Sequence, residues 1–394
     1  MKNILKNIAY IVLSITGLFF KKSNIIIIGG PSRARYAGNV KYLFEYLHKN
    51  SNYQCYWLTE SQEIINYLKL KGFKYLTNKN MLFKTYITLQ CKVVIDSGTG
   101  FYDLFYLLSR SKTVKKISTM HGSGPKLTIP DDANKMAEIR GISRFDCVSF
   151  CSEYSKKKIG FEEYQLSPEK AYIFGQPKHD ILNNHKLSTE TYNAKKWTKT
   201  LFSKAYNSQK IIYYCPTWRS KSNSIPIMQL KGFNLKEFDD FLVKNNILFI
   251  YSLHLMSDFN TELKNCSNIK IISNDMFPLF DNLELIMESD MMIGDYGTLS
   301  TDYTILKKPQ LFVIPDYDEV FSSKGFIEDI KKLLPGKVIE SYNDLCSSIL
   351  LYLESNELYE KNHSKSIRDL QLKYLGEINQ SSSERFLDYI NKNV

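Results

Sequence analysis

The 394-residue sequence predicts an α/β fold built from two doubly wound domains that face each other across a cleft. Three observations lead to this prediction. The chain is longer than one ordinary domain, strand-like apolar runs alternate with helical patterns almost throughout, and a polar stretch interrupts the alternation near the middle. Such alternation indicates parallel sheets with helices on both faces.

Composition is that of a globular protein with a core, with 43% hydrophobic and 24% charged residues. The formal net charge of +11 indicates a negatively charged partner, such as nucleic acid, anionic lipid or a phosphorylated substrate. The seven cysteines form no CxxC pair, so they predict buried free thiols and neither a zinc site nor a disulfide framework. The sequence requires no cofactor and leaves dependence on a divalent cation open.

Residues 1–22 stand apart from the alternating pattern. Thirteen apolar or small residues, 8–20, have two lysines on each side. A spanning helix needs about 20 residues, and a strand-like run takes the place of a signal-peptide cleavage site. We therefore expect a short membrane-associating segment that lies in the bilayer interface. A first helix packed on the protein's own surface is the alternative.

The first domain is predicted over residues 23–183 and the second over 210–394, with a polar linker at 184–209 that is helical in part. In the first domain, strands are expected at 24–30, 54–59, 91–98, 115–122, 145–152 and 171–180, and helices at 38–50 and 60–72. In the second, strands are expected at 210–220, 247–255, 268–274, 291–295 and 309–316, and helices at 279–289 and 341–353.

The clearest candidate site follows the strand-like run at 291–295, where a helix is expected from Leu299 to Leu306. Free N–H groups and the positive end of the helix dipole attract an anion at such a place. Plain capping of an ordinary helix by a hydroxyl is the alternative. The candidate residues there are Gly297, Thr298, Ser300, Thr301 and Asp302, the last of which could also accept a hydrogen bond from a ligand hydroxyl.

Polar residues also follow other predicted strands, whose carboxyl ends meet at one edge of a sheet. Arg219 comes just after Pro216, and arginine suits bidentate binding of phosphate. His254 and His121 each follow a strand, and glycines 122 and 124 leave room for a ligand beside His121. The turn at 175–180 supplies Lys178, His179 and Asp180. A surface arginine and structural histidines are the alternatives. Together these residues indicate phosphoryl or glycosyl transfer from an anionic donor.

In combination, the segments resemble the CDP-glycerol:poly(glycerophosphate) glycerophosphotransferases, the family of teichoic acid and phosphate-containing capsule polymerases and primases. They occur in the family's order and span nearly the whole chain after residue 23. The segments are NVKYLFEYL (39–47), HGSGPK (121–126), GQPKHD (175–180), CPTWR (215–219), SLHL (252–255), the stretch 289–320 and SSSERFLDYI (381–390).

The resemblance implies two Rossmann-like domains in a GT-B-like arrangement, with the acceptor on the first and the CDP donor on the second. It implies transfer of a polyol phosphate, glycerol phosphate in the first instance, from a CDP-activated donor such as CDP-glycerol, with release of CMP. The acceptor would be a hydroxyl of a cell-surface glycopolymer or of its lipid-linked precursor. The enzyme would then be peripheral, at the cytoplasmic face of the cell membrane on its inner leaflet, without a nucleic-acid partner.

Roles for individual residues follow from the same resemblance. His121 would be the base that deprotonates the attacking hydroxyl, and His254 would stabilise the donor phosphates together with Arg219. An imidazole with a pKa near 6.5 suits a base at neutral pH. Thr298, Ser300 and Asp302 would hold the pyrophosphate and the polyol. The other residues assigned to substrate binding are Gly122, Ser123, Lys126, Lys178, Gly297 and Thr301.

The sequence departs from the commoner family pattern in three places. Gly-Ser-Gly-Pro-Lys follows His121 where Gly-Thr-Pro-Leu-Lys is usual, DYGT (295–298) replaces Asp-Tyr-Ser-Ser, and no proline follows His254. The polyol, the acceptor, and the choice between one added unit and many stay open.

A glycosyltransferase of the same architecture that uses a nucleotide sugar is the alternative function, and a non-catalytic anion-binding module is the third. No carboxylate is clearly placed to bind a ribose or hexose, which disfavours the sugar donor. Asp316-Tyr317-Asp318 matches the metal-binding DxD pattern, but we interpret it as a solvated turn after Pro315. Lysines and arginines are dispersed and form no basic run interleaved with aromatic residues, which disfavours nucleic acid.

Overall fold

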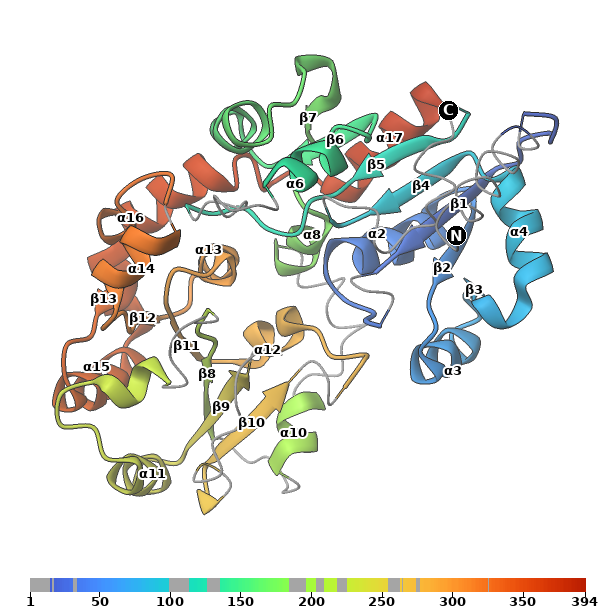
Figure 1. Ribbon diagram of the computed structural model, residues 1–394. Coiled ribbons are helices and arrows are strands. Elements are labelled where there is room, and N and C mark those ends of the chain that lie inside the picture. The colour runs from blue at the N-terminus through green and yellow to red at the C-terminus, as the bar shows by residue number, and fades with distance from the viewer. Residues whose placement is uncertain are drawn as a thin grey trace.

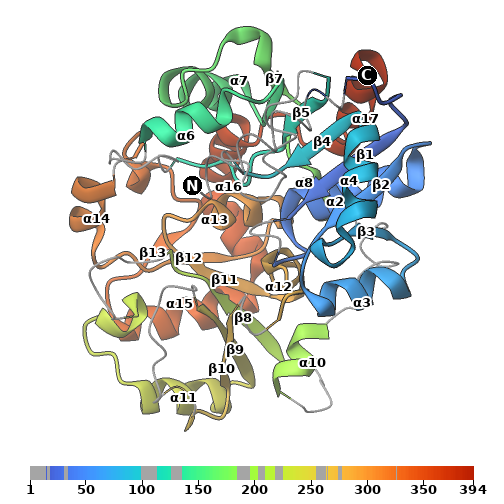
Figure 2. The same cartoon turned by 45° about the vertical axis from the view of Figure 1, so that its right-hand side comes forward.

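The computed structural model describes residues 15, 18–30, 34–98, 113–125, 135–183, 196–202, 209–217, 225–253, 263, 265–273, 277–324 and 326–394. In this part of the chain two sheets form, of seven and six strands, and every strand pairs in parallel with its neighbours (Figures 1 and 2). The prediction of an α/β fold with two parallel sheets is confirmed.

The first sheet has the strand order β3-β2-β1-β4-β5-β6-β7. Alternate residues of β1 enter different cores, Ile25 and Ile27 on one face and Ile26 and Ile28 on the other, so helices cover both faces. Its elements are β1 (Ile25–Gly29), α2 (Gly38–Asn50), β2 (Gln54–Leu58), α3 (Gln62–Leu70), β3 (Lys74–Leu76), η2 (Asn78–Asn80), α4 (Met81–Gln90), β4 (Val93–Asp96), β5 (Lys115–Ser118), α6 (Lys135–Ile142), β6 (Cys147–Phe150), α7 (Glu153–Ser155), η3 (Lys156–Glu163), η4 (Pro168–Lys170), β7 (Ala171–Ile173) and α8 (Pro177–Asn183).

The second sheet has the order β10-β9-β8-β11-β12-β13. Both sheets have the same topology. The direction of the strand order reverses between β1 and β4 in the first sheet and between β8 and β11 in the second. Its elements are α10 (Lys196–Phe202), β8 (Lys210–Tyr214), η5 (Pro226–Gln229), α11 (Leu235–Lys244), β9 (Ile247–Leu253), β10 (Ile269–Ser273), α12 (Asn282–Glu288), β11 (Met291–Gly294), α13 (Thr298–Tyr303), η7 (Thr304–Leu306), β12 (Gln310–Phe312), α14 (Tyr317–Lys324), η8 (Ile330–Lys332), β13 (Lys337–Val338), α15 (Tyr342–Glu354), α16 (Asn356–Tyr374) and α17 (Ser382–Asn393).

Helix α17 packs on the first sheet, although residues 210–394 were predicted to form the second domain (Figure 1). Phe386 and Ile390, four residues apart on one face of α17, are buried in the same core as Ile26 of β1. The carboxylate of Asp180 on α8 accepts hydrogen bonds from the backbone N–H groups of Ser382 and its successor at the start of α17. The predicted division therefore does not separate the two cores at the C-terminal helix.

Two predicted segments lie largely outside the described residues. Of the membrane-associating segment 1–22, the structure describes Ile15 and residues 18–22, and the side chains of Ile15, Leu18 and Phe19 are exposed. Of the predicted linker 184–209, residues 196–202 form α10, whose Trp197 is buried in the core of the second sheet. Within the described residues, no helix combines the length and the apolar character that crossing a bilayer demands.

Candidate active site

The loop that follows β5 lies directly against the first turn of α13. A Cβ atom added at Gly122 would lie 2.8 Å from Oγ1 of Thr298, and one added at Gly124 would lie 3.2 Å from Oγ1 of Thr301. The sequence suggested that these glycines leave room for a ligand, but a helix of the second sheet occupies that space. The two predicted sites, one after β5 and one after β11, are therefore parts of a single site.

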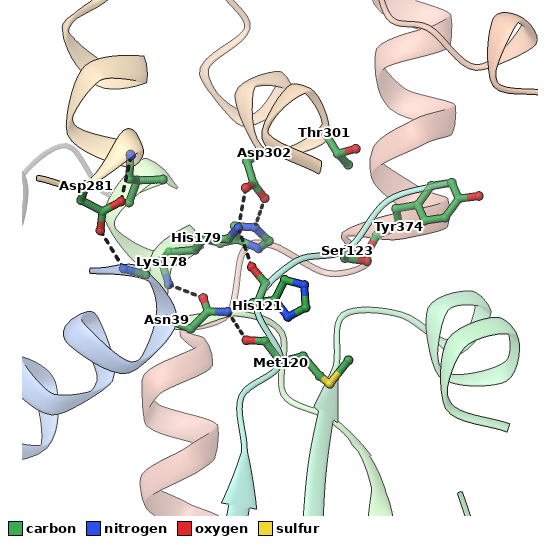
Figure 3. A network of polar contacts seen from close by, with 12 residues as sticks. Asn39, Met120, His121, Ser123, Lys178, His179, Asp281, Thr301, Asp302 and Tyr374 are labelled. Carbon is green, nitrogen blue, oxygen red and sulfur yellow. Dashed lines mark hydrogen bonds and ion pairs between the residues drawn. The ribbon is translucent and has the colours of Figure 1, made fainter. Parts of the chain in front are cut away.

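His121 is exposed at the end of this strand, and its backbone is held on both sides. The preceding residue, Met120, has a φ of 51°, which is unusual for a residue other than glycine. Nδ2 of Asn39 donates to the Met120 carbonyl at 2.7 Å, and Nζ of Lys178 lies 3.5 Å from the His121 carbonyl (Figure 3). Such strain persists only where neighbours fix the backbone, so the position of His121 is set by α2 and α8.

Ser123, which was predicted to bind substrate, is buried, and its hydroxyl bonds to the backbone in this structure. Its Oγ donates to the carbonyl of Tyr374 at the end of α16, at 2.6 Å. The loop after His121 is thus held by an element of the C-terminal part of the chain as well as by α2 and α8.

Lys178 and Asp302, both predicted to bind substrate, form a buried ion pair with each other (Figure 3). The other carboxylate oxygen of Asp302 bonds to His179, with Nε2 of His179 and Oδ1 of Asp302 2.7 Å apart. Burial by itself raises the pKa of the Asp302 carboxyl, but the nearby Lys178 ammonium and the hydrogen bond from His179 outweigh burial and lower the pKa. Asp302 is therefore an anion whose partners come from α8, which is attached to the other sheet.

The centre of the second sheet holds a carboxylate that the sequence analysis did not select. Asp295 is buried just after β11, and β11 pairs with β8 where the chain order reverses. It accepts hydrogen bonds from the backbone N–H groups of Thr217, at 2.7 Å, and Gly297, at 3.1 Å. Ligands of doubly wound sheets bind at this kind of reversal. The sequence feature that could have identified Asp295 is its position as a carboxylate directly after a strand-like run.

The predicted helix begins at Thr298, one residue before the expected start, with Gly297 as its N-cap. These two residues are partly exposed, whereas Ser300, Thr301 and Asp302 are buried. The hydroxyl of Ser300 has no hydrogen-bond partner within the described part of the chain and points toward Gly294. Of these five residues, Gly297 and Thr298 are thus the two that a bound anion can reach directly.

Three predicted site residues, Lys126, Arg219 and His254, lie outside the described residues. The nearest described parts of the chain to the last two are Thr217, whose backbone N–H donates to Asp295, and strand β9, which ends at Leu253 and pairs with the central strand β8.

A second polar cluster joins the start of α2 to the start of α12. The Asp281 carboxylate accepts from the backbone N–H of Gly38 at 2.8 Å and from the Tyr42 hydroxyl at 3.0 Å. Lys41 forms a buried ion pair with Glu284, with Nζ and Oε1 2.7 Å apart. Local sequence patterns could not predict this cluster, because its members are about 240 residues apart in the chain.

The DxD pattern lies at the start of α14 and is more ordered than a solvated turn. Asp316 accepts a hydrogen bond from the Tyr296 hydroxyl at 2.8 Å. Tyr317 is buried, and its hydroxyl donates to Asp329. Asp316 therefore has a local structural role.

Comparison with known proteins agrees with the fold. The family model of CDP-Glycerol:Poly(glycerophosphate) glycerophosphotransferase matches residues 11–392. The chain is similar to the teichoic acid poly(glycerol phosphate) polymerase of Bacillus spizizenii, with 25% identity over 369 residues and 88% of each chain covered. It is also similar to the teichoic acid glycerol-phosphate primase of Bacillus subtilis, with 28% identity over 276 residues and 68% of each chain covered.

Among solved structures, the wall teichoic acid polymerase TagF shares the fold. It superimposes with a TM-score of 0.74 at 20% identity, over 100% of this chain and 95% of that one. The match to the family model extends over nearly all of the chain, including both sheets and the site between them. This protein therefore belongs to the CDP-glycerol:poly(glycerophosphate) glycerophosphotransferase family.

Proposed function

We propose that this enzyme transfers glycerol phosphate from CDP-glycerol to a hydroxyl of a growing cell-wall polymer and releases CMP. One observation carries the proposal. The loop of His121 packs against Thr298 at the start of α13, beside the reversal point where Asp295 holds the backbone of Thr217 and Gly297. A base from one sheet and an anion-binding turn from the other thus share one site.

In the proposed reaction, His121 accepts the proton of the acceptor hydroxyl. The hydroxyl oxygen then forms a bond to the phosphorus that carries glycerol. The bond from that phosphorus to the bridging oxygen breaks, and CMP leaves with the electron pair. Phosphoryl transfer depends mainly on positioning and on stabilisation of the phosphate charge. The first turn of α13 would supply N–H groups and hydroxyls, and Arg219 and His254 would supply positive charge.

Lys178 and Asp302 act differently from the original expectation in this proposal. Both are buried in a pair with each other, so they position the His121 loop relative to α13 and do not bind the donor. Nζ of Lys178 lies 3.5 Å from the His121 carbonyl. Through this contact Lys178 can hold the His121 loop directly.

The finer features are also proposals. The two units would form a GT-B-like enzyme, with the acceptor on the first and the donor on the second. Two relatives are named a polymerase and a primase, and glycerol phosphate is the unit in both names, which favours a teichoic acid chain over a capsule. The acceptor would be polymeric or linked to lipid, and residues 1–22 would hold the enzyme peripherally at the cytoplasmic face of the membrane.

A donor screen tests the proposed function. Purified enzyme with an acceptor is given CDP-glycerol, CDP-ribitol or a nucleotide sugar, and release of CMP, UMP or UDP is measured. We expect CMP from CDP-glycerol, dependent on acceptor and strongly reduced in His121→Ala. Turnover of a nucleotide sugar without turnover of either CDP-polyol would replace this proposal with glycosyl transfer. CMP release from CDP-ribitol alone would change the polyol.

A further inference from the structure

The two units share a short sequence pattern at the point where each sheet reverses. The strand order reverses between β1 and β4 in the first sheet and between β8 and β11 in the second. Asp-Ser-Gly-Thr (96–99) comes at the end of β4, and Asp-Tyr-Gly-Thr (295–298) comes at the end of β11. The two stretches differ at one residue. The first sheet therefore carries a counterpart of the turn that belongs to the proposed donor site.

The other strand of each reversal is also followed by similar residue types. Gly-Pro-Ser (30–32) follows β1, with Arg33 and Arg35 after it, and Cys-Pro-Thr (215–217) follows β8, with Arg219 after it. A proline, a hydroxyl and an arginine thus come in the same order after both strands. Arginine and hydroxyl side chains are suited to binding phosphate. The repeated pattern indicates that the reversal of the first sheet, like that of the second, binds an anion.

The structure gives the two turns the same hydrogen bond. Oδ1 of Asp96 accepts from the backbone N–H of Gly98 at 2.9 Å, and Oδ1 of Asp295 accepts from that of Gly297 at 3.1 Å. Ser97 lies inside the first turn and is 5% exposed, and its hydroxyl forms no hydrogen bond within the described residues. This hydroxyl is therefore available to donate to a ligand.

Arg35 is held at the carboxyl end of β1, next to the second unit. A Cβ atom added at Gly30 would lie 2.3 Å from the Arg35 carbonyl oxygen, so the backbone of Arg35 packs against the residue that follows β1. The next residue, Tyr36, donates its backbone N–H to the carbonyl of Pro278 in the second unit at 3.0 Å. Arg35 is partly exposed. It therefore supplies a permanent positive charge where the two units meet.

Both parts of this reversal are attached to the strand that carries His121. Oγ of Ser118, three residues before His121, donates to the carbonyl of Gly98 at 3.1 Å. From the other side, Nδ2 of Asn39 donates to the carbonyl of the residue before His121 at 2.7 Å (Figure 3). Asn39 belongs to α2, which begins three residues after Arg35. The proposed base therefore lies beside the reversal, at the same edge of the first sheet.

We propose that the reversal of the first sheet binds a phosphate group of the acceptor, through Arg35 and the turn 96–98. This inference rests on the proposed function, in which His121 accepts the proton of the acceptor hydroxyl. In a chain of glycerol phosphate, the terminal hydroxyl and the nearest phosphate belong to the same glycerol. A phosphate site beside the base therefore suits that chain end. The enzyme then prefers an acceptor that already ends in glycerol phosphate over an uncharged alcohol, as extension of a chain requires.

The groups of this acceptor site have different tasks. The guanidinium of Arg35 donates to the phosphate oxygens and balances their charge, and the hydroxyl of Ser97 donates to one of them. Asp96 shapes the turn through its bond to Gly98, as Asp295 does in the second sheet. Loss of the arginine should therefore weaken binding of a charged acceptor. The donor phosphates are assigned to the second sheet, so binding of the donor should be retained.

Two small acceptors test the preference on the wild-type chain. Glycerophosphoglycerol has one phosphate between two glycerols, and diglycerol is its uncharged counterpart. Each is given to the purified full chain with CDP-glycerol, and release of CMP is measured. Each is also tested as a competitor of transfer to the acceptor that is used in the donor screen. We expect kcat/KM to be higher for glycerophosphoglycerol by about tenfold or more, and competition by this compound alone.

Substitutions then test the residues of the site. Arg35→Gln should reduce the preference for glycerophosphoglycerol by about tenfold or more, because a charge-assisted contact is lost. The change should appear in KM for this acceptor, with a much smaller change in kcat at saturation. Arg35→Lys keeps the charge and should recover part of the preference, and Ser97→Ala should reduce it less than Arg35→Gln does. Arg144→Gln is the matched control, because Arg144 is an exposed arginine just before β6, at the opposite edge of the same sheet.

Three outcomes would overturn the acceptor site. The wild type could treat the two acceptors alike, Arg35→Gln could keep the same preference as Arg144→Gln, or Arg35→Gln could weaken binding of CDP-glycerol in calorimetry, which would assign this arginine to the donor. The first comparison needs no substitution, so it decides the question even where a variant does not fold. Release of CMP without a preference would refute the acceptor site alone. No release of CMP from CDP-glycerol with any acceptor would refute the proposed function instead.

Discussion

Lys178 of α8 and Asp302 of α13 form a buried ion pair between elements of the two sheets, with Nζ and Oδ2 2.5 Å apart. His179 holds the other carboxylate oxygen. Burying such a pair removes both charges from water, which is unfavourable. The attraction between the two charges offsets this cost only while both partners are present. The contact between the two units therefore depends on matched charges as well as on apolar packing.

Loss of one partner should destabilise the fold more than loss of both. We expect Asp302→Asn or Lys178→Met to lower the free energy of unfolding by about 3–5 kcal/mol, because an unpaired charge or its donor stays buried. Lys178→Met/Asp302→Leu should cost less than the sum of the single changes. Urea unfolding measures this. The exposed pair Lys365–Asp369 is the control, and Lys365→Met should cost less than about 1 kcal/mol. Additive costs at Lys178 and Asp302 would contradict the coupling.

The lowered pKa of Asp302 predicts a specific acid dependence of stability. A carboxyl with a lowered folded pKa contributes stability that is complete above its unfolded pKa of about 3.9 and is lost as the pH falls toward the folded pKa. The difference in unfolding free energy between wild type and Asp302→Asn should therefore shrink below about pH 4. Denaturant unfolding across this range measures the difference. A gap that stays constant from neutral pH to the acid limit would show that Asp302 is not the titrating group.

The approach of Gly122 to Thr298 predicts a steric conflict. Gly122→Ala should lower stability by about 1–3 kcal/mol, because its Cβ would meet Oγ1 and two carbons of Thr298. Thr298→Ala removes two of those atoms and should recover part of the loss in the double variant. Thermal unfolding and turnover are both measured. Gly297→Ala is the control for stability alone, since its Cβ would meet nothing closer than 3.6 Å.

The two histidines should differ in their effect on the donor. His121→Ala should reduce turnover by about 10²–10⁴-fold, the usual cost of a lost base, and leave the affinity for CDP-glycerol intact. His254→Ala should weaken both, because it is proposed to contact the phosphates before and during the reaction. Calorimetry gives the affinity, and exposed His48 on α2 is the control position. Near-normal turnover of His121→Ala would remove it as the base.

Asp295 should control donor binding without contact to the reacting atoms. The two carboxylate oxygens of Asp295 accept from the backbone N–H groups of Thr217 and Gly297. Asp295→Asn keeps only one of these oxygens, so one backbone N–H group loses its acceptor. We expect donor affinity to fall by about 1–3 kcal/mol. Asp290→Asn is a matched control, because Asp290 bonds the backbone of Ile211 at the opposite end of the same strand. Equal effects of the two substitutions would mean that Asp295 supports only the sheet.

Much of the fold follows from local patterns in the sequence. The helix expected at 38–50 is α2 to the residue, since an amphipathic pattern has clear limits there. Strands β3 and β13 were missed because they have three and two residues, too few to show a period. Helix α17 has a clear apolar face, but the pattern does not tell against which sheet that face packs.

The site was predictable as a set of positions and not as a set of contacts. The predicted strands placed residues 121 and 298 after strand ends, and the structure brings Gly122, the neighbour of His121, against Thr298. The sequence could not show that Lys178 and Asp302 neutralise each other, because they are 124 residues apart in the chain. Both residues were therefore assigned to the ligand alone, whereas the structure shows them bonded to each other between elements of the two units.

The position of α17 has a consequence for how the protein is made on the ribosome. The last strand of the first sheet ends at Ile173, but Phe386 and Ile390 of α17 complete its core. The second sheet is synthesised between β7 and α17. The first unit therefore leaves the ribosome with an uncovered apolar face, which stays uncovered until the second sheet and α17 have been translated. Nascent chains of this length expose such faces to aggregation. Ribosome-associated chaperones should therefore engage the first unit during synthesis, and release should coincide with emergence of α17.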